Sequence, residues 1–263
     1  MGRAAGLERS LDSRDASSSV EGKKRKAQAF WERYFEFYDT LNQAIPYRRM
    51  IERQVELLSP LSGERILDAG TGTGNVAVEL LARGSRVTGV DFCEPALVRC
   101  RRKAPAGDFR FGDLTQRLDL PDGGFDKAAC CCVLHVLDHA GQEQAVREIF
   151  RVVRPGGLAV VTAFATGFDP IQVYLETLRE QRRVSSLPGM IAFGVRYSFD
   201  TARILYYVSR IKRLEKSGEY LFFDRERLLD VLRQAGFEVL SDERVFASQC
   251  VTAVARRPLE TRA

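Results

Sequence analysis

The apolar residues of this chain follow two different spacings between residues 59 and 164. Short apolar runs of the length of buried strands alternate with segments whose apolar residues recur at helical spacing, such as residues 76–81 and 143–153. Strands that alternate with helices predict a parallel sheet built from strand–helix–strand units. The five strands expected on this basis are residues 66–68, 86–92, 109–114, 125–134 and 158–164.

A glycine-rich turn follows the first expected strand. Asp68 closes the strand, and Gly70, Gly72 and Gly74 follow at alternate positions before the first helix. Glycines accept positive φ and let a ligand approach the backbone, and the helix start then offers unpaired N–H groups. Because Asn75 stands at the third glycine position of G-x-G-x-x-G, the dinucleotide-binding pattern is not met.

Three of the expected strands end in an acidic residue, namely Asp68, Asp91 and Asp113. Taken singly, Asp68 is equally well explained as a helix cap and Asp91 as an acid in a surface turn. Ligands of open α/β sheets bind outside the carboxyl ends of the strands, where all three acids are expected. In such a nucleotide fold, an acid at Asp91 accepts hydrogen bonds from two ribose hydroxyls. The set therefore predicts a ligand site.

The D-x-G-x-G-x-G turn, the three acids and the Arg154-Pro155-Gly156-Gly157 turn together resemble class I S-adenosylmethionine (SAM) dependent methyltransferases. The resemblance covers residues 62–164 and 222–255. It implies an α/β, doubly wound, mostly parallel seven-stranded sheet with the Rossmann-like methyltransferase fold. It also implies SAM as the cofactor, with Asp113 at the adenine amino group and the carbonyls near Cys130 at the methionine ammonium. The cofactor-binding residues implied in this way are Asp68, Gly70, Thr71, Gly72, Gly74, Asp91, Phe92, Asp113, Leu114 and Cys130.

With 263 residues and 45% apolar content, the chain has room for one α/β domain with an insertion. Five segments are expected. A disordered tail covers residues 1–22, an N-terminal helical cap 23–58 and the SAM-binding core 59–164. A helical lid covers residues 165–218, with helices near 170–182 and 199–213 around the apolar loop 187–194. Residues 219–263 complete the sheet, and the lid is the expected acceptor-binding insertion.

Aromatic residues are concentrated in the N-terminal helical segment. Phe30, Tyr34 and Phe37 share one helical face, which is typical of core packing. Residues 38–42 have the form Y-D-x-x-N and resemble a segment of quinone-biosynthesis C-methyltransferases that helps to close the cofactor site. The serine, glycine and tryptophan that usually follow are missing here, so a quinone acceptor is one alternative among several.

Charge and cysteine content narrow the function classes. The net charge of +5 lies outside residues 59–164, where basic and acidic residues balance, and no RNA-binding module is visible. No cysteines have zinc spacing, and Cys130, Cys131 and Cys132 on one strand are expected to be small buried hydrophobic residues. No apolar run is long enough to span a bilayer and no signal peptide is visible, so we expect a cytoplasmic protein.

The predicted activity is methyl transfer to a small acceptor that is partly apolar or aromatic, and a lipid-like acceptor at a membrane surface is left open. Transfer from a sulfonium mainly requires alignment and exclusion of water, so a base is needed only for a poorly ionised acceptor. His135, just past the fourth strand, is the candidate base. The alternatives are an RNA or protein methyltransferase and a non-catalytic SAM-binding partner subunit.

Overall fold

The computed structural model describes residues 32–35, 38, 39, 42, 44–184, 206 and 209–259. The predicted tail 1–22, the loop 187–194 and most of the helix predicted at 199–213 lie outside these residues. Phe30 and Phe37 of the aromatic stripe lie outside them as well.

The described residues form a seven-stranded sheet in the order β3-β2-β1-β4-β5-β7-β6. Strands β1 to β5 pair in parallel, whereas β7 lies antiparallel between β5 and β6. This arrangement confirms the predicted doubly wound, mostly parallel sheet. The strands are β1 (Arg65–Ala69), β2 (Arg86–Asp91), β3 (Asp108–Phe111), β4 (Phe125–Cys131), β5 (Val153–Phe164), β6 (Glu238–Val245) and β7 (Cys250–Arg256).

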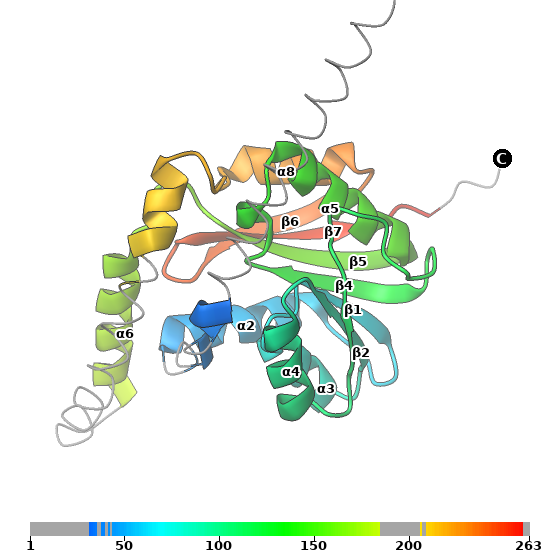
Figure 1. Ribbon diagram of the computed structural model, residues 1–263, viewed down its shortest axis with the longest axis horizontal. Helices are drawn as coiled ribbons and strands as arrows, with labels where there is room; N and C mark the ends of the chain where they lie inside the picture. The colour runs from blue at the N-terminus through cyan, green and yellow to red at the C-terminus, as the bar shows by residue number, and fades with distance from the viewer. Residues whose placement is uncertain are drawn as a thin grey trace, which may run out of the picture.

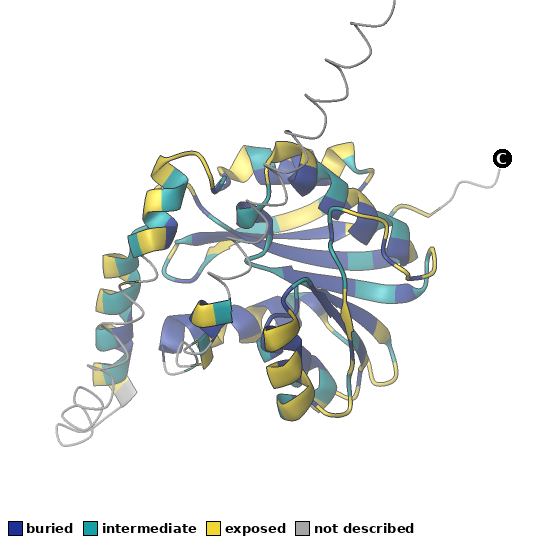
Figure 2. Cartoon of the chain, viewed as in Figure 1, coloured by how far each residue is buried: buried dark blue, intermediate teal, exposed yellow. Residues whose placement is uncertain are grey.

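Helices cover both faces of the sheet (Figure 1). On one face lie α2 (Ile45–Leu58), α3 (Asn75–Ala82) and α4 (Glu94–Lys103). On the other lie α5 (His139–Val152) and α8 (Arg225–Gln234). Each layer buries its own apolar cluster against the strands, and the buried residues follow the central strands in Figure 2. Because helices cover both faces of the sheet, the carboxyl ends of the strands are where a ligand can bind.

Several elements begin or end at a residue other than the expected one, for reasons visible in their hydrogen bonds. Helix α5 begins at His139, four residues before the predicted start, because the Asp138 carboxylate accepts from the Gly141 N–H at 2.8 Å and caps the first turn. Strand β4 ends at Cys131, because Cys132 has a left-handed φ of 55° and leaves the sheet. The turn η2 (Leu134–Val136) follows.

Helix α6 (Pro170–Val184) extends from the end of β5 along the side of the molecule. It lies where the first helix of the lid was predicted, near residues 170–182. The buried Glu180 carboxylate of α6 forms an ion pair with Arg49 of α2, at an N–O distance of 2.9 Å. A second helix runs through residues 209–216. Within the described part of the chain, no helix is both long enough and apolar enough to cross a membrane.

Candidate functional site

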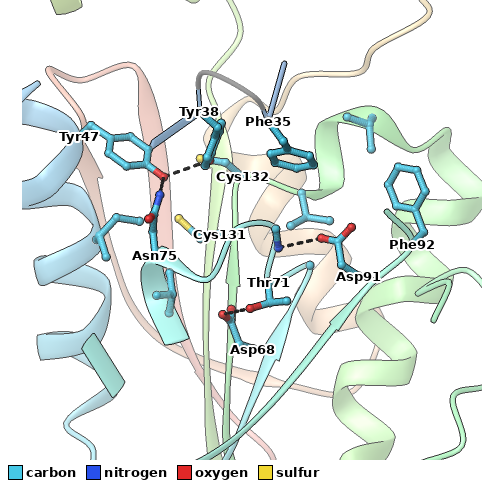
Figure 3. Close-up of a pocket in the computed structure, with 16 residues that line it drawn as sticks. Phe35, Tyr38, Tyr47, Asp68, Thr71, Asn75, Asp91, Phe92, Cys131 and Cys132 are labelled. Carbon is cyan, nitrogen blue, oxygen red and sulfur yellow. Dashed lines mark hydrogen bonds between the residues drawn. The ribbon is translucent and has the colours of Figure 1, made fainter. Parts of the chain in front are cut away.

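A cavity opens at the carboxyl ends of β1, β2 and β4, where the strand order reverses direction (Figure 3). We call it the glycine-loop cavity. Its floor is the turn after β1, with Gly70, Thr71 and Gly72, and Asp68 lies beneath that turn. Its other walls come from the ends of β2 and β4, from the first turn of α3, and from aromatic residues that precede the sheet.

The turn after β1 depends on glycine for two separate reasons. Gly70, Gly72 and Gly74 all have left-handed φ values, of 75°, 52° and 84°. A Cβ at Gly70 would lie 2.2 Å from Val133 Cγ2, whereas one at Gly72 would lie 3.3 Å from the Phe35 ring. Gly70 is therefore packed against the neighbouring β4 turn, and Gly72 faces the cavity beside an aromatic ring.

Two buried carboxylates hold the turn in place. Asp91 accepts the Gly72 N–H at 2.8 Å on one oxygen and the Cys93 N–H at 2.9 Å on the other. Asp68 accepts the Thr71 hydroxyl at 2.7 Å. Burial raises the pKa of Asp68 to about 7 and the pKa of Asp91 to about 6, although these hydrogen bonds act in the opposite direction.

The wall from β4 is apolar and sulfur-rich. Cys131, Cys132, Val133 and Val136 line the cavity, whereas the Cys130 side chain packs into the core on the opposite face, as strand alternation requires. The neighbouring Cys132 thiol and burial raise the pKa of Cys131 well above its usual value. The thiols are therefore protonated at neutral pH, which agrees with the expectation of small hydrophobic residues rather than nucleophiles.

Three aromatic rings close the cavity from the N-terminal side. Tyr38 packs edge-on against both Phe35 and Tyr47, with ring centroids 5.2 and 5.9 Å apart. Figure 3 shows Phe35 and Tyr38 over the glycine turn, between Tyr47 on one side and Asp91 with Phe92 on the other. The N-terminal segment therefore forms a wall of the cavity as well as part of the core.

A chain of polar side chains joins this wall to α3 and α4. Tyr47 donates from its hydroxyl to the Tyr38 oxygen at 3.0 Å, and Asn75 Nδ2 donates to the Tyr47 oxygen at 3.0 Å. Lys103 Nζ donates to Asn75 Oδ1 and to Asp39 Oδ1, both at 2.6 Å. The Y-D-x-x-N residues Tyr38 and Asp39 are thus tied to the helix that follows the glycine turn.

The structure brings together six of the ten residues that the resemblance assigned to the cofactor, and these are Asp68, Gly70, Thr71, Gly72, Asp91 and Phe92. The other four do not line the cavity. Gly74 caps α3 with its backbone, and a Cβ there would meet Cys100 Sγ at 2.5 Å. Asp113 accepts the Thr115 N–H and hydroxyl, and Leu114 and Cys130 lie in the core.

His135 does not lie where the sequence suggested. Its side chain is fully buried, and its ring packs edge-on against Phe164, Tyr220 and Phe222 at centroid distances of 4.8–5.6 Å. Burial lowers the pKa of His135 to about 3. Val133, just before the turn η2, and Val136 within it line the cavity, whereas His135 does not. The His135 ring is thus absent from the residues that line the cavity, and its role as a base stays a prediction.

Sequence reasoning missed the residues that complete the walls. Tyr47, Ile51 and Val76 line the cavity but read as ordinary core positions of amphipathic helices. In the sequence, Asn75 stands out only because it breaks the dinucleotide-binding pattern. Its link to Tyr47 spans 28 residues, so no local pattern indicates it.

Comparisons with known proteins identify the family to which this chain is similar. A family model described as a methyltransferase domain matches residues 66–157. A demethylmenaquinone methyltransferase of Thermus thermophilus is 38% identical over 135 residues, which are 48% of this chain and 60% of that relative. The ubiquinone/menaquinone biosynthesis C-methyltransferase UbiE of Bdellovibrio bacteriovorus is 30% identical over 189 residues, 66% of this chain and 70% of its own.

Solved structures show the same fold at low sequence identity. The magnesium protoporphyrin IX methyltransferase of Synechocystis, solved with bound S-adenosylhomocysteine (SAH), superposes with a TM-score of 0.62 at 14% identity. The match covers 89% of this chain and 99% of that one.

Proposed function

Because the chain belongs to the class I SAM-dependent methyltransferases, we propose that it transfers a methyl group from SAM to a small aromatic acceptor of the quinone type. The two relatives named above are quinone-biosynthesis methyltransferases, and this supports the acceptor class. The observation that carries the proposal is the glycine-loop cavity. It combines two buried carboxylates that are hydrogen-bonded to the glycine turn with an apolar wall of Cys131, Cys132, Val133 and Val136.

The residues present fit a nucleoside cofactor. Each Asp91 oxygen accepts one backbone N–H, and a carboxylate has about four acceptor sites in total, so capacity remains for ribose hydroxyls. Phe92 lines the cavity next to Asp91 and offers an aromatic surface for a base. Gly72 leaves the turn open beside both, where a side chain would meet Phe35.

When bound, SAM supplies an electrophilic methyl group on a positively charged sulfur. The protein's own work is then to orient two molecules and keep water out. Asp91 fixes the donor through its ribose, and Val133 and Val136 present an apolar surface on which an aromatic ring packs. Phe35 and Tyr38 cover the turn from the opposite side. No described side chain other than Asp68 and Asp91 offers a carboxylate to this cavity, and both lie on the side of the turn.

Calorimetry with SAM tests the cofactor assignment through Asp91→Ala. Loss of a charged hydrogen-bond partner costs about 1.5–3 kcal/mol, so we expect SAM affinity to fall by about ten-fold or more. Glu79→Gln on the exposed side of α3 is the matched control and is expected to retain wild-type affinity. Unchanged affinity in the folded Asp91→Ala protein would remove the basis of the proposal.

Turnover separates an enzyme from a SAM-binding partner subunit. We expect purified protein to release SAH when it is given SAM and an alkyl-substituted hydroquinone. Tight SAM binding without methyl transfer to a panel of hydroquinones, phenols and amines would favour the partner-subunit alternative instead.

A further inference from the structure

The hydrogen-bond chain behind the cavity has a fixed direction. An ammonium group only donates hydrogen bonds, so Lys103 must face the amide oxygen of Asn75, at 2.6 Å. The Asn75 Nδ2 group must then face Tyr47, whose oxygen accepts at 3.0 Å. The Asn42 amide also donates to Asn75 Oδ1, at 3.1 Å, which fixes the same orientation.

The direction of these hydrogen bonds decides whether the Tyr38 hydroxyl can donate to a ligand in the cavity. The Tyr47 hydroxyl donates its proton to the Tyr38 oxygen at 3.0 Å, so the Tyr38 oxygen is an acceptor inside the chain. The proton of Tyr38 is then available to the cavity, which its side chain lines. The hydroxyl on the floor of the cavity, that of Thr71, donates to Asp68 at 2.7 Å and is not available.

The surroundings of Tyr38 favour an anionic partner. Burial raises the pKa of Tyr38 well above its usual value, so the phenol remains a donor at neutral pH. The hydrogen-bond chain that ends at Tyr38 begins at the ammonium group of Lys103. Asn75, within that chain, is the first residue of α3, and the amino end of this helix carries a partial positive charge. Asp68 and Asp91 accept hydrogen bonds and repel an anion. In Figure 3, Tyr47 lies on the opposite side of the cavity from Asp91, and Tyr38 lies between them, next to Tyr47.

We propose that Tyr38 donates a hydrogen bond to the carboxylate of the methionine part of SAM, and that Tyr47 and Asn75 are positioning residues that orient the Tyr38 hydroxyl. The inference rests on the proposed function, because it adds a holder for the one anionic group of SAM. Asp91 would hold the ribose end and Tyr38 the amino-acid end. The two ends of the cavity thus differ in sign, which sets the direction in which SAM lies.

Three ligands test this assignment by calorimetry: SAH, its decarboxylated analogue, and 5′-methylthioadenosine, which lacks the whole amino-acid part. Wild-type protein is expected to bind SAH at least about ten-fold more tightly than the decarboxylated analogue, as a hydrogen bond to a charged group implies. Tyr38→Phe is expected to abolish most of this ratio and to leave affinity for 5′-methylthioadenosine within about three-fold. Tyr47→Phe is expected to reduce the ratio in part.

Tyr34→Phe is the matched control. Tyr34 belongs to the same aromatic cluster, with its ring 5.3 Å from Tyr38, but it does not line the cavity. It is expected to retain the wild-type ratio, and thermal unfolding of each variant checks the fold.

A Tyr38→Phe protein that keeps the full affinity ratio overturns the inference. If that variant also shows a raised KM for the acceptor, the Tyr38 phenol contacts the acceptor and not the SAM carboxylate. If wild-type protein binds none of the three ligands, the proposed function itself fails and the inference with it.

Discussion

At the scale of single residues, Gly70 carries two constraints that can be measured apart. Its φ of 75° disfavours any side chain, and a Cβ there would overlap Val133. Gly63 has a similar φ of 82°, with nothing within 4 Å of the Cβ position. The pair therefore separates backbone strain from steric overlap.

We expect Gly63→Ala to lower the free energy of unfolding by about 1–2 kcal/mol through strain alone. Gly70→Ala is expected to lower it by about 1–3 kcal/mol more, because it adds overpacking against Val133. Urea denaturation measures both, and Gly70→Ala combined with Val133→Ala should recover the steric part only. Equal losses in the two single variants would show that Val133 moves aside without cost.

The pKa values of Asp68 and Asp91 predict a pH dependence of stability. Both are raised from an ordinary value near 4, to about 7 and about 6. Between pH 4 and 7 the folded state therefore binds more protons than the unfolded state, so stability falls as the pH rises through this window.

We expect Asp68→Asn to remove part of that dependence. The stability of wild-type relative to Asp68→Asn should decrease by about 1–3 kcal/mol between pH 4.5 and 7.5, since one pKa unit corresponds to about 1.4 kcal/mol. Denaturant titrations at several pH values measure it, with Glu79→Gln as the control. A constant difference across the window would show that Asp68 titrates at an ordinary pKa in the folded protein.

At the scale of elements, the turn η2 decides which side chains reach the cavity. Consecutive residues there point in different directions, with Val136 lining the cavity and His135 buried among aromatic rings. The sequence placed both just past the fourth strand. It could not show the direction of either, because Cys132 has a left-handed φ that rotates the chain after β4.

We expect His135→Met to change turnover and SAM affinity by less than about three-fold, while lowering stability by about 1–3 kcal/mol through altered packing. Val136→Trp is expected to reduce kcat/KM by more than ten-fold, because it fills the cavity. Steady-state kinetics at neutral pH compares the two. A loss of about 10²-fold or more in a folded His135→Met protein would restore His135 as a general base.

Element types were easier to predict than the contacts between elements. The alternation of apolar runs and helical spacing indicated strands β1 to β5 and helices α3 and α5. The acids closing β1 and β2 indicated Asp68 and Asp91 as cavity residues. Tyr38 and Tyr47 are held at the cavity by contacts with residues far along the chain, such as Asn75 on α3. The spacing of hydrophobic residues cannot predict such long-range pairs.

At the scale of the whole molecule, the family resemblance correctly implied a doubly wound, mostly parallel seven-stranded sheet. The structure also shows a buried hydrogen-bond network that links a helix to two strands of this sheet. Thr162 on β5 donates to Gln54 of α2 at 2.7 Å and lies 2.8 Å from Thr252 on β7. One buried hydrogen-bonded group thus connects α2 with β5 and with β7, the last strand of the sheet along the chain.

The position of β7 has a consequence for how the chain is made. Strand β5 gains its second neighbour only when β7, near the C-terminus, has left the ribosome, because β7 pairs with it along residues 250–256. Until then the growing chain carries the glycine turn, both buried acids and a long unpaired apolar edge, and such edges template aggregation. A message cut short before residue 250 would therefore encode every cavity residue described above and still yield insoluble protein.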